Sequence, residues 1–192
     1  MKMEMKIKMK IFSLAWLLIP LAIAFMPRTP ALTPSDGNGI DLIHKTCNHT
    51  AEYNLCVALL QSDPRSLTAD VKGLASIMLD LTLRNTNQTL SQVKELLKDT
   101  SLDQRIKQCF LTCVEVYEKT TQLYIPAALN SLQTDSYADA RKEGSDAFTT
   151  VQTCGRELVK SGGLDKEPAI IDRNKFDQHL ASLSLDIIYI LG

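Results

Sequence analysis

The chain has 192 residues, of which 45% are hydrophobic and 22% are charged. This composition is typical of a globular protein and excludes a wholly disordered or collagen-like chain. The formal net charge of −1 excludes the strongly basic surface that nucleic-acid-binding proteins carry, so no nucleic-acid partner is expected. The length predicts a single domain.

Residues 1–31 have the pattern of a secretory signal peptide. Four lysines precede an apolar run from Ile11 to Met26, and small residues follow. The run contains Pro20 and is shorter than the roughly 20 residues of a membrane-spanning helix, so an uncleaved anchor is the less favoured alternative. We predict cleavage between residues 24 and 31, a linker at 32–39 and a domain at 40–192. The mature protein is expected to be secreted and free of the membrane.

Cleavage of the signal peptide would change the net charge of the chain, and secretion would place its cysteines in an oxidising compartment. The mature chain keeps 16 Lys and Arg against 21 Asp and Glu, a balance of −5 that favours a basic partner surface. Cysteines of secreted proteins are mostly paired, and the odd number of five leaves one over. Asn48-His-Thr50 and Asn87-Gln-Thr89 are N-glycosylation sequons, which predicts that Asn48 and Asn87 lie on the surface.

Helical periodicity dominates the mature chain, and no segment has the alternation of a strand. Two short helices are predicted, at 41–46 and 51–61. A long helix follows at 67–98, and we expect Asn85-Thr-Asn87 to break it.

Three further long helices are predicted after residue 100. The first starts at an expected capping box, Ser101-Leu-Asp-Gln104, and should kink at Pro126. Asp135-Ser136 is expected to cap the next helix, which ends at Gly162-Gly163. The last helix follows a loop that contains Pro168. Apolar residues recur along all four long helices at intervals of four and three, so the fold class is predicted as all-α. It is an antiparallel up-and-down four-helix bundle with an N-terminal helical hairpin.

The cysteine spacing indicates two disulfides. Cys47 and Cys56 lie on either side of the turn between the short helices. Cys109 and Cys113 lie one turn apart on one face of a helix, so a bond between them would be strained. Either one can pair with Cys154 on the next helix. The remaining thiol is expected to be a buried core residue or, alternatively, the link of a dimer.

No sequence feature indicates catalysis. The chain lacks the motifs of serine hydrolases, zinc proteases, nucleotide-binding loops and dinucleotide-binding folds. His44, Cys47, His49 and Cys56 have a spacing that a zinc site can use, but secretion favours a disulfide with two exposed histidines. We therefore expect no enzyme activity, no cofactor and no bound metal.

Several motifs in order resemble the plant invertase/pectin methylesterase inhibitor family over residues 40–191. These are Cys47-x5-Tyr53-x2-Cys56, Ser62-Asp63-Pro64-x-Ser66, Asp70, Cys113-x3-Tyr117, Ala128-Leu129, Tyr137-x2-Ala140 and Cys154. The resemblance implies the bundle and the hairpin, disulfides Cys47–Cys56 and Cys113–Cys154, and a free thiol at Cys109.

The resemblance also implies a function. Family members are secreted proteins that dock on a carbohydrate-active enzyme of the cell wall (apoplast) or vacuole and block its cleft. The stretch around 62–80 is more similar to the invertase inhibitors, so an acid invertase is the expected partner. A pectin methylesterase is the alternative, and a non-inhibitory bundle that signals or carries a small apolar ligand is a further one. Tyr137-Ala138-Asp139 stands where invertase inhibitors have Pro-Lys-Phe.

We place the candidate target-binding surface at residues 132–142. Its candidate contact residues are Asp135, Ser136, Tyr137, Asp139 and Arg141. The alternative interpretation of these residues is a helix cap followed by a solvated first turn.

Overall fold

The computed structural model describes residues 36–162 and 168–192. The expected signal peptide and its cleavage site lie outside the described residues, as does the first half of the expected linker. Within the described ranges, no helix combines the length and the apolar character needed to cross a bilayer.

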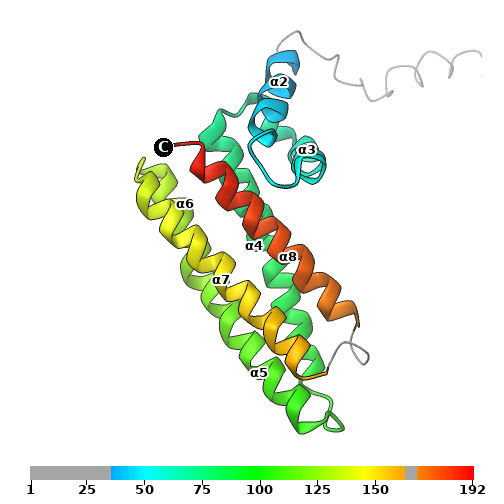
Figure 1. Ribbon diagram of the computed structural model, residues 1–192. Coiled ribbons are helices and arrows are strands. Elements are labelled where there is room, and N and C mark those ends of the chain that lie inside the picture. The colour runs from blue at the N-terminus through cyan, green and yellow to red at the C-terminus, as the bar shows by residue number, and fades with distance from the viewer. Residues whose placement is uncertain (1–35, 163–167) are drawn as a thin grey trace, which may run out of the picture. The chain divides into compact units, whose positions relative to one another are not determined.

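The body of the described domain is a bundle of four helical rods (Figure 1). The rods are α4 (Val71–Leu96), the run α5 (Gln104–Lys119), η3 (Thr120–Tyr124) and α6 (Ile125–Gln133), then α7 (Tyr137–Lys160) and α8 (Pro168–Tyr189). α4 packs on α5 and α8, and α7 packs on α8 and on the α5–α6 rod. Short connections make successive rods antiparallel, so the predicted all-α four-helix bundle is confirmed.

Most residues of the predicted apolar stripes form the core, and Leu123, which the same spacing places on a stripe, is an exception at 56% exposure. Val116 of α5, Val151 of α7 and Leu180 of α8 are among the buried side chains, and each such residue stabilises the fold by roughly 1.5–3 kcal/mol. α7 uses small residues where it meets α8. A Cβ atom on Gly144 would lie 3.4 Å from the Cδ1 atoms of Leu185 and Ile188, so a small residue here lets the two helices approach closely.

The N-terminal hairpin consists of α2 (Asp36–Cys47) and α3 (Tyr53–Gln61), followed by a short 3₁₀ helix, η2 (Pro64–Thr68). α2 begins five residues before the predicted start at 41, so residues 36–39 are helix and not linker. Gly39 explains the extension, because a Cβ atom there would lie 2.0 Å from the Leu67 carbonyl oxygen. Only glycine allows α2 to pass this close to the η2 backbone.

A disulfide between Cys47 and Cys56 closes the hairpin, with the Cα atoms 5.6 Å apart. The hairpin buries little apolar surface of its own, so we expect it to depend on this bridge. Cys56→Ser should destabilise the hairpin by about 2.7 kcal/mol, the loop-entropy value for a loop this short. Amide exchange should rise at residues 37–61, while the circular dichroism of the bundle changes little. Cys109→Ala, which keeps both bridges, is the control. Loss of all helical signal in Cys56→Ser would contradict this division of stability.

The prediction of a break in α4 is wrong. The side chains of Asn85, Thr86 and Asn87 each donate to a carbonyl oxygen one turn earlier, at distances of 3.0, 2.8 and 2.9 Å, and the helix continues. Thr86 is also fully buried, which stabilises the helical conformation by packing.

Two helix starts also differ from the predictions. Asp70, not a residue near 67, caps α4 by accepting a hydrogen bond of 2.7 Å from the Gly73 amide. Asp103 caps α5 by accepting from the Arg105 amide at 2.9 Å, so the expected Ser101 capping box does not form. Ser101 instead donates from both its amide and its hydroxyl to Asp99.

The rod that contains Pro126 is irregular just before the proline. Residues 120–124 form the π-helical turn η3, and α6 begins at Ile125. Proline cannot donate a backbone hydrogen bond to Gln122, and a π turn is a common way for a helix to absorb such a defect. The π-helical turn lies directly before Pro126, and a kink of the rod at this position stays a prediction.

Candidate functional site

The candidate surface at 132–142 is the turn between α6 and α7. Asp135 has a positive φ of 56°, which is uncommon for a residue other than glycine. The Asp135 amide donates to Leu132 O at 3.2 Å and the Ser136 amide donates to Ser131 O at 2.8 Å. This pair of bonds is the Schellman motif that ends α6. The expected side-chain cap from Asp135 and Ser136 on α7 is therefore wrong, because Ser136 occupies the cap position without a side-chain bond.

A three-residue cluster holds the turn. Lys72 of α4 donates to Asp135 Oδ1 at 2.8 Å, and the Tyr137 hydroxyl donates to the same oxygen at 2.8 Å. The hydrogen bond from Lys72 holds the pKa of Asp135 below its usual value, and the Tyr137 hydroxyl lowers it further. The same contacts with Asp135 raise the pKa of Lys72 and of Tyr137. These contacts favour the ionised form of Asp135 and hold its side chain in place.

The other candidate contact residues lie along the first turns of α7. Ser136 is half-buried, and its hydroxyl accepts from the Thr134 hydroxyl at 3.2 Å. Asp139 is exposed in the first turn, where the helix dipole favours a negative charge. The guanidinium of Arg141 lies 6.0 Å from the ring centre of Tyr189 on α8, within the range of a cation–π contact.

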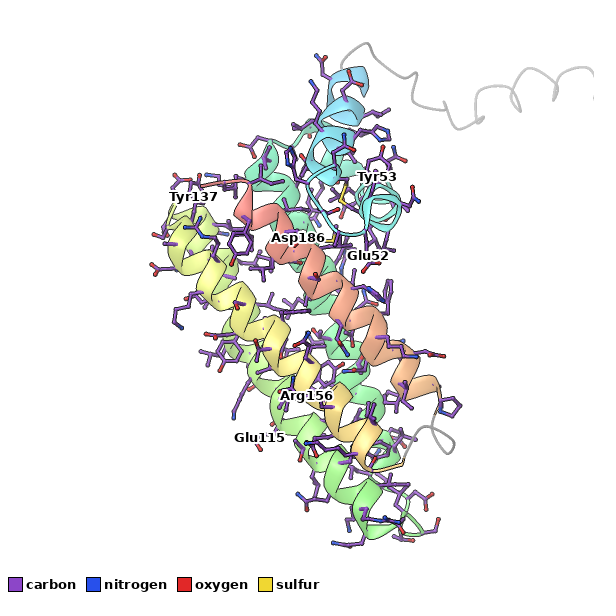
Figure 2. The ribbon with its side chains drawn as sticks, in the orientation of Figure 1. Glu52, Tyr53, Glu115, Tyr137, Arg156 and Asp186 are labelled. Carbon is purple, nitrogen blue, oxygen red and sulfur yellow. A yellow bond between two sulfur atoms is a disulfide. The ribbon has the colours of Figure 1, made fainter. Side chains whose placement is uncertain are left out.

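The structure brings two residues to this surface that the sequence analysis did not name. Lys72 precedes Asp135 by 63 residues, and no sequence pattern links them. Tyr189 is 60% exposed. It directly follows the buried residues Ile187 and Ile188 in the sequence, so its spacing alone does not mark it as a surface residue. Figure 2 shows Tyr137 at the start of α7, at the end of the bundle where α8 finishes. We refer to Lys72, Asp135, Tyr137, Asp139, Arg141 and Tyr189 as the end surface.

The second disulfide joins α5 and α7. Cys113 and Cys154 are bonded, with their Cα atoms 4.7 Å apart, and Cys109 is the free cysteine. Cys109 is 4% exposed, and burial raises the pKa of its thiol. A protonated, buried thiol is a poor nucleophile, which favours a packing role for Cys109 over a link between chains.

The residues considered for zinc make other contacts. Cys47 and Cys56 are bonded to each other, and His44 Nδ1 lies 2.7 Å from the Tyr53 hydroxyl. Within residues 36–162 and 168–192, no three His, Cys, Asp or Glu side chains are grouped to hold a metal ion. His179 pairs with Glu52 and so links α8 to the hairpin.

A buried polar cluster in the middle of the bundle was missed by the sequence analysis. Asp177 of α8 is 1% exposed, and its Oδ2 accepts from Thr89 Oγ1 at 2.6 Å and from the Tyr117 hydroxyl at 2.8 Å. Asn174 donates to the Tyr117 oxygen at 3.0 Å and to Val151 O at 3.0 Å. Burial raises the pKa of Asp177 to about 6, although the two hydroxyl groups oppose the shift. Its side chains are almost fully buried and already bonded to one another, so we assign the cluster to stability rather than to a reaction.

Comparison with known proteins identifies the family. The family model described as plant invertase/pectin methylesterase inhibitor matches residues 41–187. A cell wall/vacuolar inhibitor of fructosidase 2 from Arabidopsis thaliana is 38% identical over 105 residues, which are 55% of this chain. That match spans 57% of the relative, little more than half of its length. A pectinesterase inhibitor from Actinidia deliciosa is 29% identical over 138 residues, 72% of this chain and 71% of the relative.

A solved structure supports the fold. The crystal structure of a mutant form of a pectin methylesterase inhibitor from Arabidopsis superposes with a TM-score of 0.66. The superposition covers 76% of this chain and 94% of that one, at 23% identity. The family is shown by the match of its model to residues 41–187. The chain belongs to the plant invertase/pectin methylesterase inhibitor family, a family of inhibitors.

Proposed function

We propose that this chain is a secreted inhibitor that blocks the active-site cleft of a plant acid invertase (β-fructofuranosidase). The observation that carries the proposal is the 38% identity to a relative named as an inhibitor of fructosidase. A second relative of that name, from the same plant, is 26% identical over 148 residues, 77% of this chain and 68% of the relative. The site of action is the cell wall or the vacuole, as the names of both relatives state for them.

The end surface has the features of a docking surface. Lys72 and Tyr137 both bond to Asp135, so the turn is already ordered before any partner binds. An ordered surface loses less conformational entropy on binding than a flexible one. Tyrosine and arginine are also the residues that most often dominate binding energy, and Tyr137, Arg141 and Tyr189 supply them here. The end surface therefore fits insertion into an enzyme cleft.

A pectin methylesterase is the second candidate target. The pectinesterase inhibitor from Actinidia deliciosa matches a larger share of this chain than the 38% relative does. In addition, Tyr137-Ala138-Asp139 departs from the Pro-Lys-Phe of the invertase inhibitors. A non-inhibitory bundle that signals or carries an apolar ligand is the third candidate, and the open groove described below is the feature that favours it.

The two sequons remain proposed glycosylation sites. Asn48 lies in the turn between α2 and α3 and Asn87 lies within α4, and both side chains are exposed. Neither residue belongs to the end surface, so glycans at these positions are compatible with the proposed docking.

The experiment compares inhibition constants for purified acid invertase and pectin methylesterase. The test variants are Tyr137→Ala and Asp139→Lys, and the control is Glu115→Lys. Glu115 is exposed on α5, away from the end surface, and pairs only with Lys119 of the same helix among the described residues (Figure 2). Such exposed pairs contribute little to stability.

We expect each test variant to inhibit invertase at least ~10-fold more weakly than the native protein, which is the effect of losing one dominant interface residue. Glu115→Lys should inhibit as the native protein does. Inhibition of pectin methylesterase alone would assign the second target. Equal inhibition by all variants would place the binding surface elsewhere, and inhibition of neither enzyme would refute the proposal.

A further inference from the structure

A groove between α7 and α8 lies away from the end surface. It has a volume of about 540 Å³, which is within the range of small-molecule sites, and it is open to the surface rather than enclosed in the core. Leu158 and Ile171 form its apolar floor at 2% and 7% exposure, and Val159 stands in its wall at 60% exposure. Val159 is one of the few large apolar side chains that this domain exposes.

Cations surround this apolar floor. Arg156, Lys160 and Lys175 line the groove, and Figure 2 shows Arg156 on the later half of α7. Lys160 pairs with Glu157 at 2.7 Å, and Lys175 lies 3.7 Å from Asp172. Among the described residues Arg156 pairs with no carboxylate, and it donates only to the Thr153 hydroxyl, at 2.7 Å. The mature chain carries five more acids than bases, so this positive groove differs from the rest of the molecule.

Two polar side chains of the lining, Asn174 and Gln178, already have partners. Gln178 donates to Asn174 Oδ1 at 2.6 Å, and Asn174 uses both of its donors within the core. Gly155 makes room for this pair, because a Cβ atom there would lie 2.5 Å from Asn174 Oδ1 and 2.6 Å from Gln178 Nε2. Among the residues that the structure describes, no aromatic ring lines the groove, so it offers a sugar no ring on which to stack.

We propose that the α7–α8 groove binds an amphipathic organic anion. Its apolar body lies on Leu158, Val159 and Ile171, and its carboxylate or similar group pairs with Arg156. Lys160 and Lys175 add positive charge beside this contact. Hydrogen bonds between arginine and a carboxylate are among the stronger polar interactions. The inference does not depend on the proposed inhibition, because the groove and the end surface share no residue.

The probe is the fluorescent anion 8-anilinonaphthalene-1-sulfonate, in which the sulfonate stands for the carboxylate. N-phenyl-1-naphthylamine has the same rings without the charge and is the neutral control. The key variant is Arg156→Gln. The control variant is Lys107→Gln, which removes the same charge from an exposed position on α5. Backbone amide shifts locate the bound probe.

The folded native protein should bind the anion with shifts at residues 155–160 and 171–178, and should bind the neutral probe at least ~10-fold more weakly. Arg156→Gln should weaken binding of the anionic probe about tenfold. Lys107→Gln should leave the affinity for this probe unchanged. If Arg156→Gln has a clearly lower melting temperature than the native protein, Lys175→Gln is measured instead. We expect Lys175→Gln to weaken binding of the anionic probe about threefold. Equal binding of both probes, no effect of either groove variant, shifts outside the groove, or no binding would each overturn the proposal.

Discussion

Removal of the Cys113–Cys154 bridge should lower the free energy of unfolding by about 4 kcal/mol, the loop-entropy value for a closed loop of this length. The bridge spans 41 residues and ties α5 to α7, and both of its cysteines are fully buried. The change to make is the double substitution Cys113→Ala/Cys154→Ala. For a domain of this size, the loss should lower the melting temperature by roughly 10 °C.

The double substitution is needed because Cys109 lies one turn from Cys113 on the same face of α5. In Cys113→Ala alone, Cys109 is placed to take over the bond to Cys154 and hide part of the loss. Cys109→Ala, which keeps the native bridge, is the control. It should lower the free energy of unfolding much less than the double substitution does. Chemical unfolding monitored by circular dichroism measures all three proteins. A double variant within about 1 kcal/mol of the native protein would show that the bridge is not a main source of stability.

The free energy of unfolding of Asp177→Asn should increase relative to that of the native protein as the pH rises from 4 to 7. Asp177 titrates near its usual value in the unfolded chain, but burial raises its pKa to about 6 in the folded protein. The folded state therefore binds the proton more tightly, so the native protein gains stability below pH 4 and loses it as the pH rises through 6. The loss between pH 4 and pH 7 is about 2 kcal/mol. Asparagine has no charge to bury and escapes this loss.

The measurement is the difference in unfolding free energy between Asp177→Asn and the native protein at several pH values from 4 to 7. Taking the difference cancels the titration of every group that both proteins share. Asp172→Asn is the matched control, because Asp172 lies on the same helix with its side chain 78% exposed. Its difference should stay flat with pH. A flat difference for Asp177→Asn would mean that the buried carboxylate does not govern the pH dependence.

The parts of the fold that rest on apolar spacing were predictable. The stripes that include Val116, Val151 and Leu180 are buried, because a seven-residue repeat puts one face of each helix toward its neighbours. The errors lie at helix ends and at polar residues. At Asn85–Asn87 the sequence indicated a break, but tertiary packing around Thr86 outweighed the local preference of asparagine for turns.

The polar cluster had a signal that went unused. Asn174, Asp177 and Ser184 fall in the same four-three spacing as Ile170, Ala181 and Ile188, so their position on α8 places them inside the bundle. Carboxylates are rarely buried without partners, and here the partners come from α4 and α5. Only the folded arrangement shows that Thr89 and Tyr117 meet Asp177.

The candidate surface was predictable only in part. The sequence placed Asp135, Tyr137 and Arg141 near the start of one helix, and in the structure they lie in the α6–α7 turn and the first turns of α7. The positive φ of Asp135 and its bond to Lys72 depend on how α4 packs beside the α6–α7 turn. Sequence spacing carries no information on such a contact between residues 63 positions apart.

The most direct test of the account is a titration of purified plant acid invertase with the mature protein, measured as the rate of sucrose hydrolysis. A tight-binding inhibitor should lower the rate linearly up to an equimolar ratio, and the protein alone should hydrolyse no sucrose. Full invertase activity in the presence of a molar excess of the protein would contradict the account, as would sucrose hydrolysis by the protein itself.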